Sequence, residues 1–287
     1  MFEQLGLIGC GLMGGSFALA LKRAGLVKRV VGYSKSPSTT ERARQMGVID
    51  VEAPSALLAV SGADIVLLAV PVSATESTFK AIRHLITPGT LVMDVGSTKH
   101  DVVDAARRVL RDQLGCFVPA HPITGKEVSG VEHADANLYK GKQVILTPIE
   151  RTFTVQLKKA VDVWTELGCN VMQMSPQAHD AAYASVSHLP HLIAFALMNS
   201  IAGQTQGSDY LSLIGPGFRD FTRIAASDPK MLRDILMANR EELLAQSNIF
   251  KQTLQSLEKL IQDSQGDALE KQIEHASQTR ANLHIAL

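Results

Sequence analysis

The amino-acid sequence predicts an α/β fold in which a doubly wound parallel sheet is followed by a separate all-helical domain. Short apolar runs alternate with helical segments over residues 1–174, as they do in doubly wound sheets. Over residues 175–287 the segments are long, with apolar residues three or four positions apart, which is the helical period. At 287 residues the chain is long enough for two cores, so we expect two domains that meet at 174/175.

The predicted strands are rich in Val, Ile and Leu and are bounded by Gly, Pro or Asp. Such runs are typical of strands in a parallel sheet that is covered on both faces. They are Gln4–Gly9, Arg29–Tyr33, Ile65–Val70, Thr90–Val95, Cys116–Ala120, Val144–Thr147 and Asn170–Met174. The helices expected between them are Gly14–Ala24, Ser38–Met46, Ala74–Leu85, Lys99–Leu110 and Thr154–Leu167.

The second half of the chain opens with a recognisable helix start. Ser175 can cap a helix and Pro176 fits its first turn, so a helix is expected from there to about Ala202. Asp228 and Pro229 give the same signal again. The further helices expected are Gly217–Ala226, Pro229–Glu258 and Asp267–Ala281.

Composition excludes several classes of function. Acidic and basic residues are equal in number, 28 each, so no net charge attracts nucleic acid. The three cysteines, Cys10, Cys116 and Cys169, are far apart and lack C-x-x-C spacing, so we expect no disulfide framework and no metal site. The apolar start is too short for a signal peptide, and we expect no apolar run that approaches the ~20 residues of a membrane span. We therefore expect a soluble, cytoplasmic protein.

A glycine motif follows the first predicted strand. Gly9-Cys10-Gly11-Leu12-Met13-Gly14 is G-x-G-x-x-G, and it opens a predicted helix, which is the context that a dinucleotide-binding loop requires. Gly9 allows a tight turn, Gly11 allows the backbone to approach a pyrophosphate, and Gly14 allows close packing of helix and strand. An ordinary glycine turn is the alternative, but the strand and helix on either side favour a Rossmann-type NAD(P) site.

The end of the second strand indicates which dinucleotide binds. An acidic residue there would accept hydrogen bonds from the ribose of NAD, but Ser34-Lys35-Ser36 and then Thr39 offer hydroxyls and a cation instead. NADP is therefore favoured, with NAD possible if Lys35 simply faces solvent. Val70 and Pro71, at the end of the third predicted strand, complete the expected cofactor contacts.

Two polar segments follow the ends of later strands. DVGSTK spans 94–99 and HPITGKEVSG spans 121–130, and ligands of open α/β sheets bind beyond the carboxyl ends of strands. A substrate hydroxyl that loses its proton during oxidation needs an acceptor, and neutral His serves near pH 7. His121 is therefore the candidate base and Ser97 a candidate partner, although a structural role is common for a His beside a Pro.

These segments, together with SHLPH at 187–191 and GFRDFTR at 217–223, resemble in order and content the prephenate/arogenate dehydrogenase family of tyrosine biosynthesis. The resemblance implies oxidative decarboxylation of a cyclohexadienyl ring, with hydride transfer to NAD(P)+. It implies that His121 is the base and that Ser97 supports it.

The same resemblance assigns a substrate pocket and an assembly. It implies that Arg219 binds a substrate carboxylate, that His188 and His191 line the pocket, and that Glu127 is a gating partner of Arg219. A surface ion pair for Arg219 and a solvated Glu127 are the alternatives. The family forms homodimers through the helical domain, so a homodimer is expected here.

Two departures from the family pattern leave the substrate open. Lys126 stands where the family often has Thr, and Leu232 where Trp is expected. Neither touches a proposed catalytic position. Prephenate and arogenate differ only in a pyruvyl or alanyl side chain, so both remain candidate substrates. We expect neither a fused chorismate mutase nor an ACT regulatory domain.

Two other functions fit the same fold. A β-hydroxyacid dehydrogenase, pyrroline-carboxylate reductase or ketopantoate reductase would combine the same domains but typically uses a helix Lys as acid and base. A noncatalytic NAD(P)-sensing protein would keep the fold without needing Ser97, His121 and Arg219 together.

Overall fold

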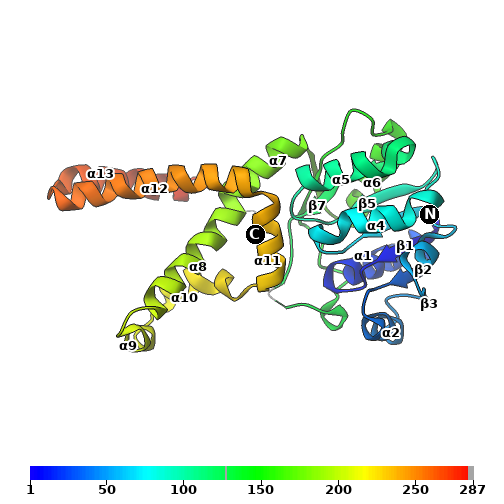
Figure 1. Ribbon diagram of the computed structural model, residues 1–287, viewed down its shortest axis with the longest axis horizontal. Coiled ribbons are helices and arrows are strands. Elements are labelled where there is room, and N and C mark those ends of the chain that lie inside the picture. Colours follow the sequence, from blue (N-terminus) through cyan, green and yellow to red (C-terminus); the bar gives the residue numbers. More distant parts are fainter. Residues whose placement is uncertain (127, 284–287) are drawn as a thin grey trace. The chain divides into compact units, whose positions relative to one another are not determined.

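The computed structural model describes residues 1–126 and 128–283, and it contains two compact units. The first unit, Met1–Arg240, holds the sheets and the helices up to α11, and the second, Glu241–Leu287, holds the last two helices (Figure 1).

A six-stranded parallel sheet forms the centre of the first unit. Its order is β3-β2-β1-β4-β5-β6, which is the order of a doubly wound dinucleotide-binding sheet and confirms the predicted fold class. The strands are β1 (Phe2–Ile8), β2 (Val27–Tyr33), β3 (Val51–Glu52), β4 (Ile65–Leu68), β5 (Leu91–Asp94) and β6 (Phe117–Val118). β3 was not predicted, because two residues are too short to show a pattern.

Two of the predicted strands lie in a second sheet with a strand that was not predicted, which corrects the expectation of a single parallel sheet. β7 (Ala120–Pro122) pairs antiparallel with β8 (Gln143–Leu146), which pairs parallel with β9 (Asn170–Gln173). The run Cys116–Ala120 breaks at Pro119, whose missing N–H cannot continue a ladder. The chain therefore leaves the main sheet just before His121.

Helices cover both faces of the main sheet. They are α1 (Leu12–Arg23), α2 (Pro37–Gln45), α3 (Ala56–Val60), α4 (Thr75–Ile82), α5 (His100–Leu110) and α6 (Thr154–Glu166). One apolar core includes side chains of α1 and α6, and the other includes side chains of α3, α4 and α5. α3 was missed by the sequence analysis because it has only five residues.

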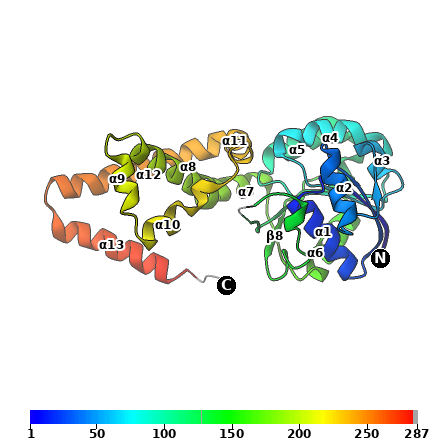
Figure 2. The same cartoon turned by 90° about the horizontal axis from the view of Figure 1, so that it is seen from below.

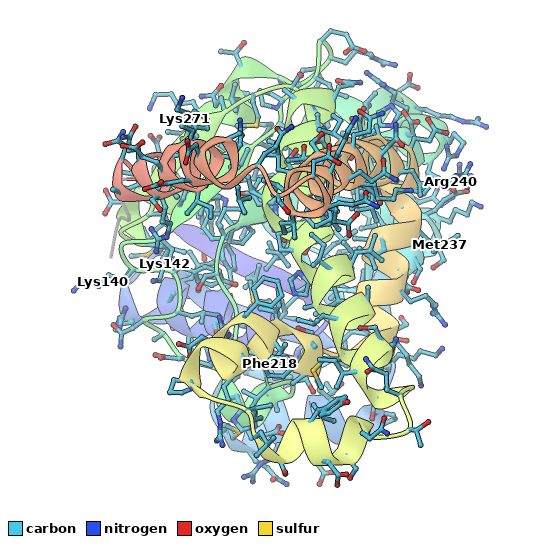
Figure 3. All side chains as sticks on the ribbon, turned by 90° about the vertical axis from the view of Figure 1, so that its left-hand side faces the viewer. Lys140, Lys142, Phe218, Met237, Arg240 and Lys271 are labelled. Carbon is cyan, nitrogen blue, oxygen red and sulfur yellow. The ribbon has the colours of Figure 1, made fainter. Side chains whose placement is uncertain are left out.

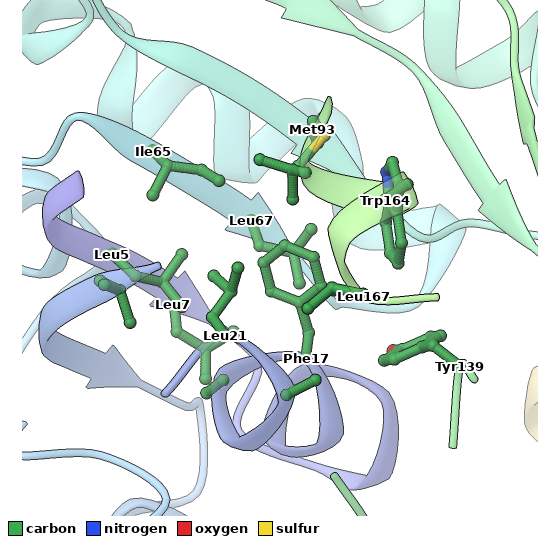
Figure 4. Close-up of a cluster of buried hydrophobic side chains, with 14 of the residues drawn as sticks. Leu5, Leu7, Phe17, Leu21, Ile65, Leu67, Met93, Tyr139, Trp164 and Leu167 are labelled. Atoms are coloured by element: carbon green, nitrogen blue, oxygen red, sulfur yellow. The ribbon is translucent and has the colours of Figure 1, made fainter. Parts of the chain in front are cut away.

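An aromatic cluster holds the first helix in place. Phe17 of α1 packs against Trp164 of α6, with ring centres 5.0 Å apart, and Trp164 packs against Tyr139 at 5.3 Å (Figure 4). The Tyr139 hydroxyl donates a 2.7 Å hydrogen bond to the carbonyl of Met13. The start of α1, where a cofactor pyrophosphate would lie, is thus fixed from the core side.

The long helix predicted from Ser175 is confirmed, with an internal change of pitch. It consists of α7 (Pro176–Tyr183), the π-helical turn η5 (Ala184–His188) and α8 (Leu189–Ala202). Pro190 has no N–H to donate to the preceding turn, and a π turn accommodates such a break. By length and hydropathy the stretch Pro176–Ala202 could cross a membrane, so the expectation that no apolar run reaches this length is corrected.

The remaining helices of the first unit are α9 (Gly207–Ser212), α10 (Pro216–Thr222) and α11 (Pro229–Ala238), with a short 3-10 turn, η6 (Arg223–Ala226), after α10. Phe218 of α10, labelled in Figure 3, lines an apolar pocket of about 280 Å³ with Ile201, Tyr210 and Leu213 among its other walls.

The single helix predicted at Pro229–Glu258 is wrong, because α11 ends before Asn239 and α12 (Arg240–Gln262) begins after it. The Asn239 side chain is buried and hydrogen-bonded within the first unit, and its backbone leaves the helical conformation. In the second unit α12 and α13 (Gly266–Ala281) run in opposite directions (Figure 2), and Ile249, Leu254 and Ile273 are exposed.

Candidate active site

The glycine loop has the geometry of an anion cradle. Gly9 has φ +95°, and a Cβ there would lie 2.1 Å from the Ala69 carbonyl oxygen, so only glycine fits. A Cβ on Gly14 would lie 2.0 Å from the carbonyl of Gly9. At Gly11, the N-cap of α1, a Cβ would meet nothing within 4 Å, and no side chain caps the helix. The residues present therefore fit a dinucleotide pyrophosphate, with open space beside Gly11 and the helix amides directed at it.

The other residues expected at the cofactor lie around this loop. Cys10, Leu12 and Gly14 are buried, and Met13 is half-buried. Val70 and Pro71 follow β4, which pairs with β1, so they share an edge of the sheet with the loop. Burial raises the pKa of the Cys10 thiol to about 11, so Cys10 contributes its backbone rather than a reactive thiolate.

Ser34 ties the end of β2 to the glycine loop. Its Oγ accepts a 2.8 Å hydrogen bond from the Cys10 amide, and its own amide donates to Thr40 Oγ1 at 3.1 Å. Lys35 and Ser36 are exposed, Thr39 is half-buried, and the first turn of α2 contains no acidic residue. The edge of the cofactor loop is thus polar or cationic, and the Ser34 hydroxyl proton remains available for donation.

A buried ion pair holds the strand that carries His121. Lys99, which is fully buried, donates from Nζ to Asp94 Oδ2 and to the carbonyl of Ala120, the latter at 2.7 Å. Asp94 Oδ1 accepts from the Ala120 amide at 3.0 Å. These contacts join the end of β5 to β7, so the two segments singled out in the sequence are brought together.

His121 meets a second histidine that the sequence analysis missed. Its Nδ1 lies 2.8 Å from Nε2 of His179, and Nδ1 of His179 lies 2.7 Å from Oδ1 of Asp180. Tyr183 of α7 packs on both imidazoles, with its ring stacked on His179 at 4.6 Å. The adjacent His-Asp pair near a helix start was the available signal, but nothing local links it to a residue 58 positions away.

The site keeps these histidines neutral. Burial lowers the pKa of His121 well below 6.5, and the nearby His179, Lys99 and His188 lower it further. Burial also lowers the pKa of His179, against the opposing effect of Asp180. For Asp180, burial raises the pKa, but the hydrogen bonds from His179 and from two backbone amides outweigh it, so the net pKa is lowered. Asp180 is therefore ionised beside two neutral imidazoles.

The histidines of SHLPH point to different partners. Nδ1 of His188, which is buried, lies 3.1 Å from the side-chain amide nitrogen of Asn239, and burial is the main cause that lowers the His188 pKa to about 4. His191 is half-buried and donates from Nδ1 to the carbonyl of Ser187 at 2.8 Å. The residues that the structure describes contain no cluster of three or more His, Cys, Asp or Glu suited to a metal.

The structure does not bring every predicted residue to His121. Ser97 is half-buried in the β5–α5 loop, and the described contacts of His121 are with His179 and Tyr183 rather than with Ser97. Arg219 is exposed on α10. Glu127 lies outside the described residues.

Of the two departures from the family pattern, Lys126 has polar partners and Leu232 is buried. Lys126 donates to the carbonyl of His133 at 3.1 Å and lies 3.8 Å from Asp135, so it holds its own loop. Leu232 is buried in α11.

Comparison with known proteins identifies the family. Residues 17–173 match the family model described as prephenate dehydrogenase, nucleotide-binding domain, and residues 175–275 match that of prephenate dehydrogenase, dimerization domain. A cyclohexadienyl dehydrogenase of Zymomonas mobilis is 33% identical over 285 residues, which are 99% of this chain and 97% of that protein.

Two further similarities extend this result. A prephenate dehydrogenase of Bacillus subtilis is 37% identical over 85% of this chain, which spans just under two thirds (66%) of that relative's length. The crystal structure of prephenate dehydrogenase from Aquifex aeolicus, in complex with hydroxyphenyl propionate and NAD+, superposes with a TM-score of 0.92 at 36% identity, covering 99% of this chain and 98% of that one. With a matching fold, a glycine cradle for a dinucleotide and a histidine at the sheet edge, the chain belongs to the prephenate dehydrogenase family.

Proposed function

We propose that this protein is an NAD(P)-dependent dehydrogenase that oxidatively decarboxylates prephenate or arogenate, giving 4-hydroxyphenylpyruvate or tyrosine. The observation that carries the proposal is His121, a neutral imidazole whose Nδ1 is engaged by His179, so that Nε2 is left to act on a substrate. It follows β6 and is joined to the end of β5, at the edge of the sheet where the glycine loop also lies.

In this mechanism His121 accepts the proton of the ring hydroxyl at Nε2 while the carbon that carries the hydroxyl loses its hydrogen with both electrons. When bound, NAD(P)+ supplies the acceptor for that hydride. The O–H electron pair forms a carbonyl, the bond to the ring carboxylate breaks to release CO2, and its electrons make the ring aromatic. The phenolate oxygen then recovers the proton from His121, so no net proton is released.

The other predicted residues bind and orient the substrate in this proposal. Ser97 supports His121 or the hydroxyl, and the exposed guanidinium of Arg219 can form a bidentate contact with a carboxylate. In the same proposal His188 and His191 contact the substrate, as the family resemblance implies. Asn239 donates to His188 Nδ1, so neutral His188 carries its proton on Nε2 and can offer a donor.

We further propose that NADP+ is preferred over NAD+. Ser34, Lys35, Ser36 and Thr39 supply hydroxyls and a positive charge where NAD-specific enzymes carry a carboxylate, and the first turn of α2 has no acidic residue to repel a 2′-phosphate.

A homodimer in the cytoplasm completes the proposal, with the cofactor and helical domains meeting at 174/175, where the two matched family models also meet. Val186, Leu213 and Ile249 are exposed in helices that a dimerization domain would cover. Buried His179, Asp180 and His188 along Pro176–Ala202 favour a subunit interface over a membrane span for the apolar face of this stretch. Light scattering at micromolar concentration should give the mass of a dimer, and a monomer would contradict this part.

The function is tested by a grid of initial rates, with prephenate or arogenate as substrate and NAD+ or NADP+ as cofactor. NAD(P)H should form with at least one substrate, faster with NADP+ than with NAD+ at equal concentration, together with CO2. If neither substrate yields NAD(P)H in any cell of the grid, the proposed reaction is wrong.

A further inference from the structure

We propose that Asp180 and His179 are positioning residues that hold His121 in the tautomer with its proton on Nδ1, leaving Nε2 as the acceptor for the substrate proton. The inference rests on the proposed function for the role of Nε2, but the tautomer is a property of the protein alone.

Asp180 anchors the chain of hydrogen bonds. Its Oδ1 accepts from the backbone amide of Lys99 and its Oδ2 from that of His100, both at 2.9 Å, and Oδ1 also faces His179 Nδ1. Two backbone amides donate to these oxygens and the pKa of Asp180 is lowered, so the group is a carboxylate with no proton of its own. The side-chain amide of Asn239 donates to the Asp180 carbonyl at 2.8 Å and so fixes the backbone of Asp180 as well.

His179 transmits this constraint to the next ring. A carboxylate can only accept, so Nδ1 of His179 must carry a proton. A neutral imidazole has one N–H, which leaves Nε2 as an acceptor. The ring is fully buried and stacked on Tyr183 with an interplanar angle of 19°, so packing opposes a ring flip that would exchange the two nitrogens.

His121 then has one arrangement that satisfies its neighbour. Its Nδ1, 2.8 Å from the acceptor Nε2 of His179, must donate, and in a neutral ring Nε2 is then unprotonated. When Nε2 takes the substrate proton, the positive charge on His121 lies two hydrogen bonds from Asp180. The logic is that of the carboxylate in a Ser-His-Asp triad, which orients a histidine and stabilises its cation without taking the proton.

Asn239 sets the opposite tautomer in His188. An amide nitrogen can only donate, so Nδ1 of His188 is the acceptor and its proton sits on Nε2. His121 is linked to Asp180 through His179, and His188 through Asn239, and the two rings carry opposite functions at Nε2: an acceptor on His121 and a donor on His188. Such an arrangement indicates a network built to define proton positions.

The first test uses three variants and one matched control. His179→Leu removes the acceptor, Asp180→Asn removes the charge, and His179→Gln keeps an oxygen acceptor for His121 Nδ1. We expect kcat to fall about 10- to 100-fold in the first two, less than the roughly 10⁴-fold of the corresponding change in a serine protease. His179→Gln should recover most of the loss, with KM for NADP+ unchanged throughout. As the control, His84→Gln changes an exposed histidine in the 3-10 turn Arg83–Leu85, and its kcat should be normal.

The second test reads the tautomer directly. Long-range 1H–15N spectra are recorded on histidine-labelled protein. The signals of His121 are those absent from the spectrum of His121→Asn, and in the wild type they should show the Nδ1–H form. They should show a mixture or the Nε2–H form in His179→Leu. Circular dichroism and NADP+ binding identify any variant that fails to fold, and the wild-type spectrum does not depend on the variants.

The outcomes separate the two proposals. A wild-type His121 in the Nε2–H form, or normal kcat in folded His179→Leu and Asp180→Asn, would overturn the positioning role. A wild type that makes no NAD(P)H from either substrate would refute the proposed function, while the spectrum still decides the tautomer.

Discussion

Backbone atoms form the functional surface of the glycine loop, whereas side chains form the chain of hydrogen bonds at His121. Gly9 has a positive φ, Gly11 leaves open space at the start of α1, and Gly14 packs closely against Gly9, all within six consecutive residues. His121, His179 and Asp180 come from β7 and α7, and the amides that fix Asp180 come from the start of α5, 80 residues earlier in the chain. The loop is therefore a local device, and the histidine site exists only when distant segments pack.

Because of this difference, we expect substitutions in the two regions to change different kinetic quantities. A change in the loop should alter cofactor affinity and leave the chemical step intact, because the loop amides are the groups proposed to bind the dinucleotide. A change in the histidine site should alter kcat and leave cofactor affinity intact. The predictions below test that separation, from the largest expected effect to the smallest.

His121→Asn should give the largest effect. General base catalysis contributes about 10²–10⁴-fold to a rate, so kcat should fall by that amount while the dissociation constant of NADP+ stays within about twofold. Stopped-flow rates and fluorescence titration measure the two quantities. A near-normal kcat would remove His121 from the role of base.

Acidification should reproduce part of that loss in the wild type. Because the pKa of His121 is lowered, the ring is neutral at pH 7 and becomes protonated only well below pH 6.5. The profile of kcat/KM should therefore stay flat through pH 6.5 and fall about tenfold per pH unit below the lowered pKa. Lys99, His179, His188, Asp180 and Tyr183 are the titratable groups around the ring. An acid limb at or above pH 6.5 would contradict the neutral site.

The same shifts link pH to folding. His121, His179 and His188 have lowered pKa values in the folded protein, so the unfolded chain binds more protons once the pH drops below its ordinary histidine pKa. Stability should be full above about pH 6.5 and decline as the pH falls toward the folded-state values.

The contrast between the two regions also explains what the sequence could predict. The glycine loop, the strands of the main sheet other than β3 and the first helix were predictable because each signal lies within a few residues. His179 and Asp180 were missed because their partners are brought close by tertiary packing. The second sheet and the helix break at Asn239 were missed for the same reason: Pro119 and Asn239 show their effect only through partners far along the chain.

Arg219→Ala tests whether Arg219, which has no described contact with His121, belongs to the same active site. A charge-assisted contact with a carboxylate is worth about 1.5–3 kcal/mol, so KM for the substrate should rise roughly 10- to 100-fold with a smaller change in kcat. Arg223→Ala, one helical turn on, is the matched comparison. If KM rises only in Arg223→Ala, the carboxylate contact has been assigned to the wrong arginine.

Paired glycine substitutions test the local half of the comparison. Gly11→Ala places its Cβ in open space, so the fold should remain and NADP+ should bind about tenfold more weakly, because the methyl group enters the space proposed for the pyrophosphate. Gly9→Ala forces a Cβ onto the Ala69 carbonyl at positive φ, which should lower the unfolding free energy by about 1–3 kcal/mol. Thermal unfolding and NADP+ titration distinguish the two, and equal effects on stability would contradict this division.

Lys35→Ala should produce the smallest effect, because an exposed ion pair contributes roughly 0.2–1 kcal/mol. KM for NADP+ should rise no more than about fivefold and KM for NAD+ should not change, since only NADP+ carries the 2′-phosphate. The effect should shrink further in high salt, where exposed charges are screened. The control is Lys28→Ala, which changes an exposed lysine at the start of β2 that pairs with Glu3 of β1. Equal changes for both cofactors would show that Lys35 does not read the phosphate, and the preference for NADP+ would then depend on the hydroxyls of Ser34, Ser36 and Thr39 alone.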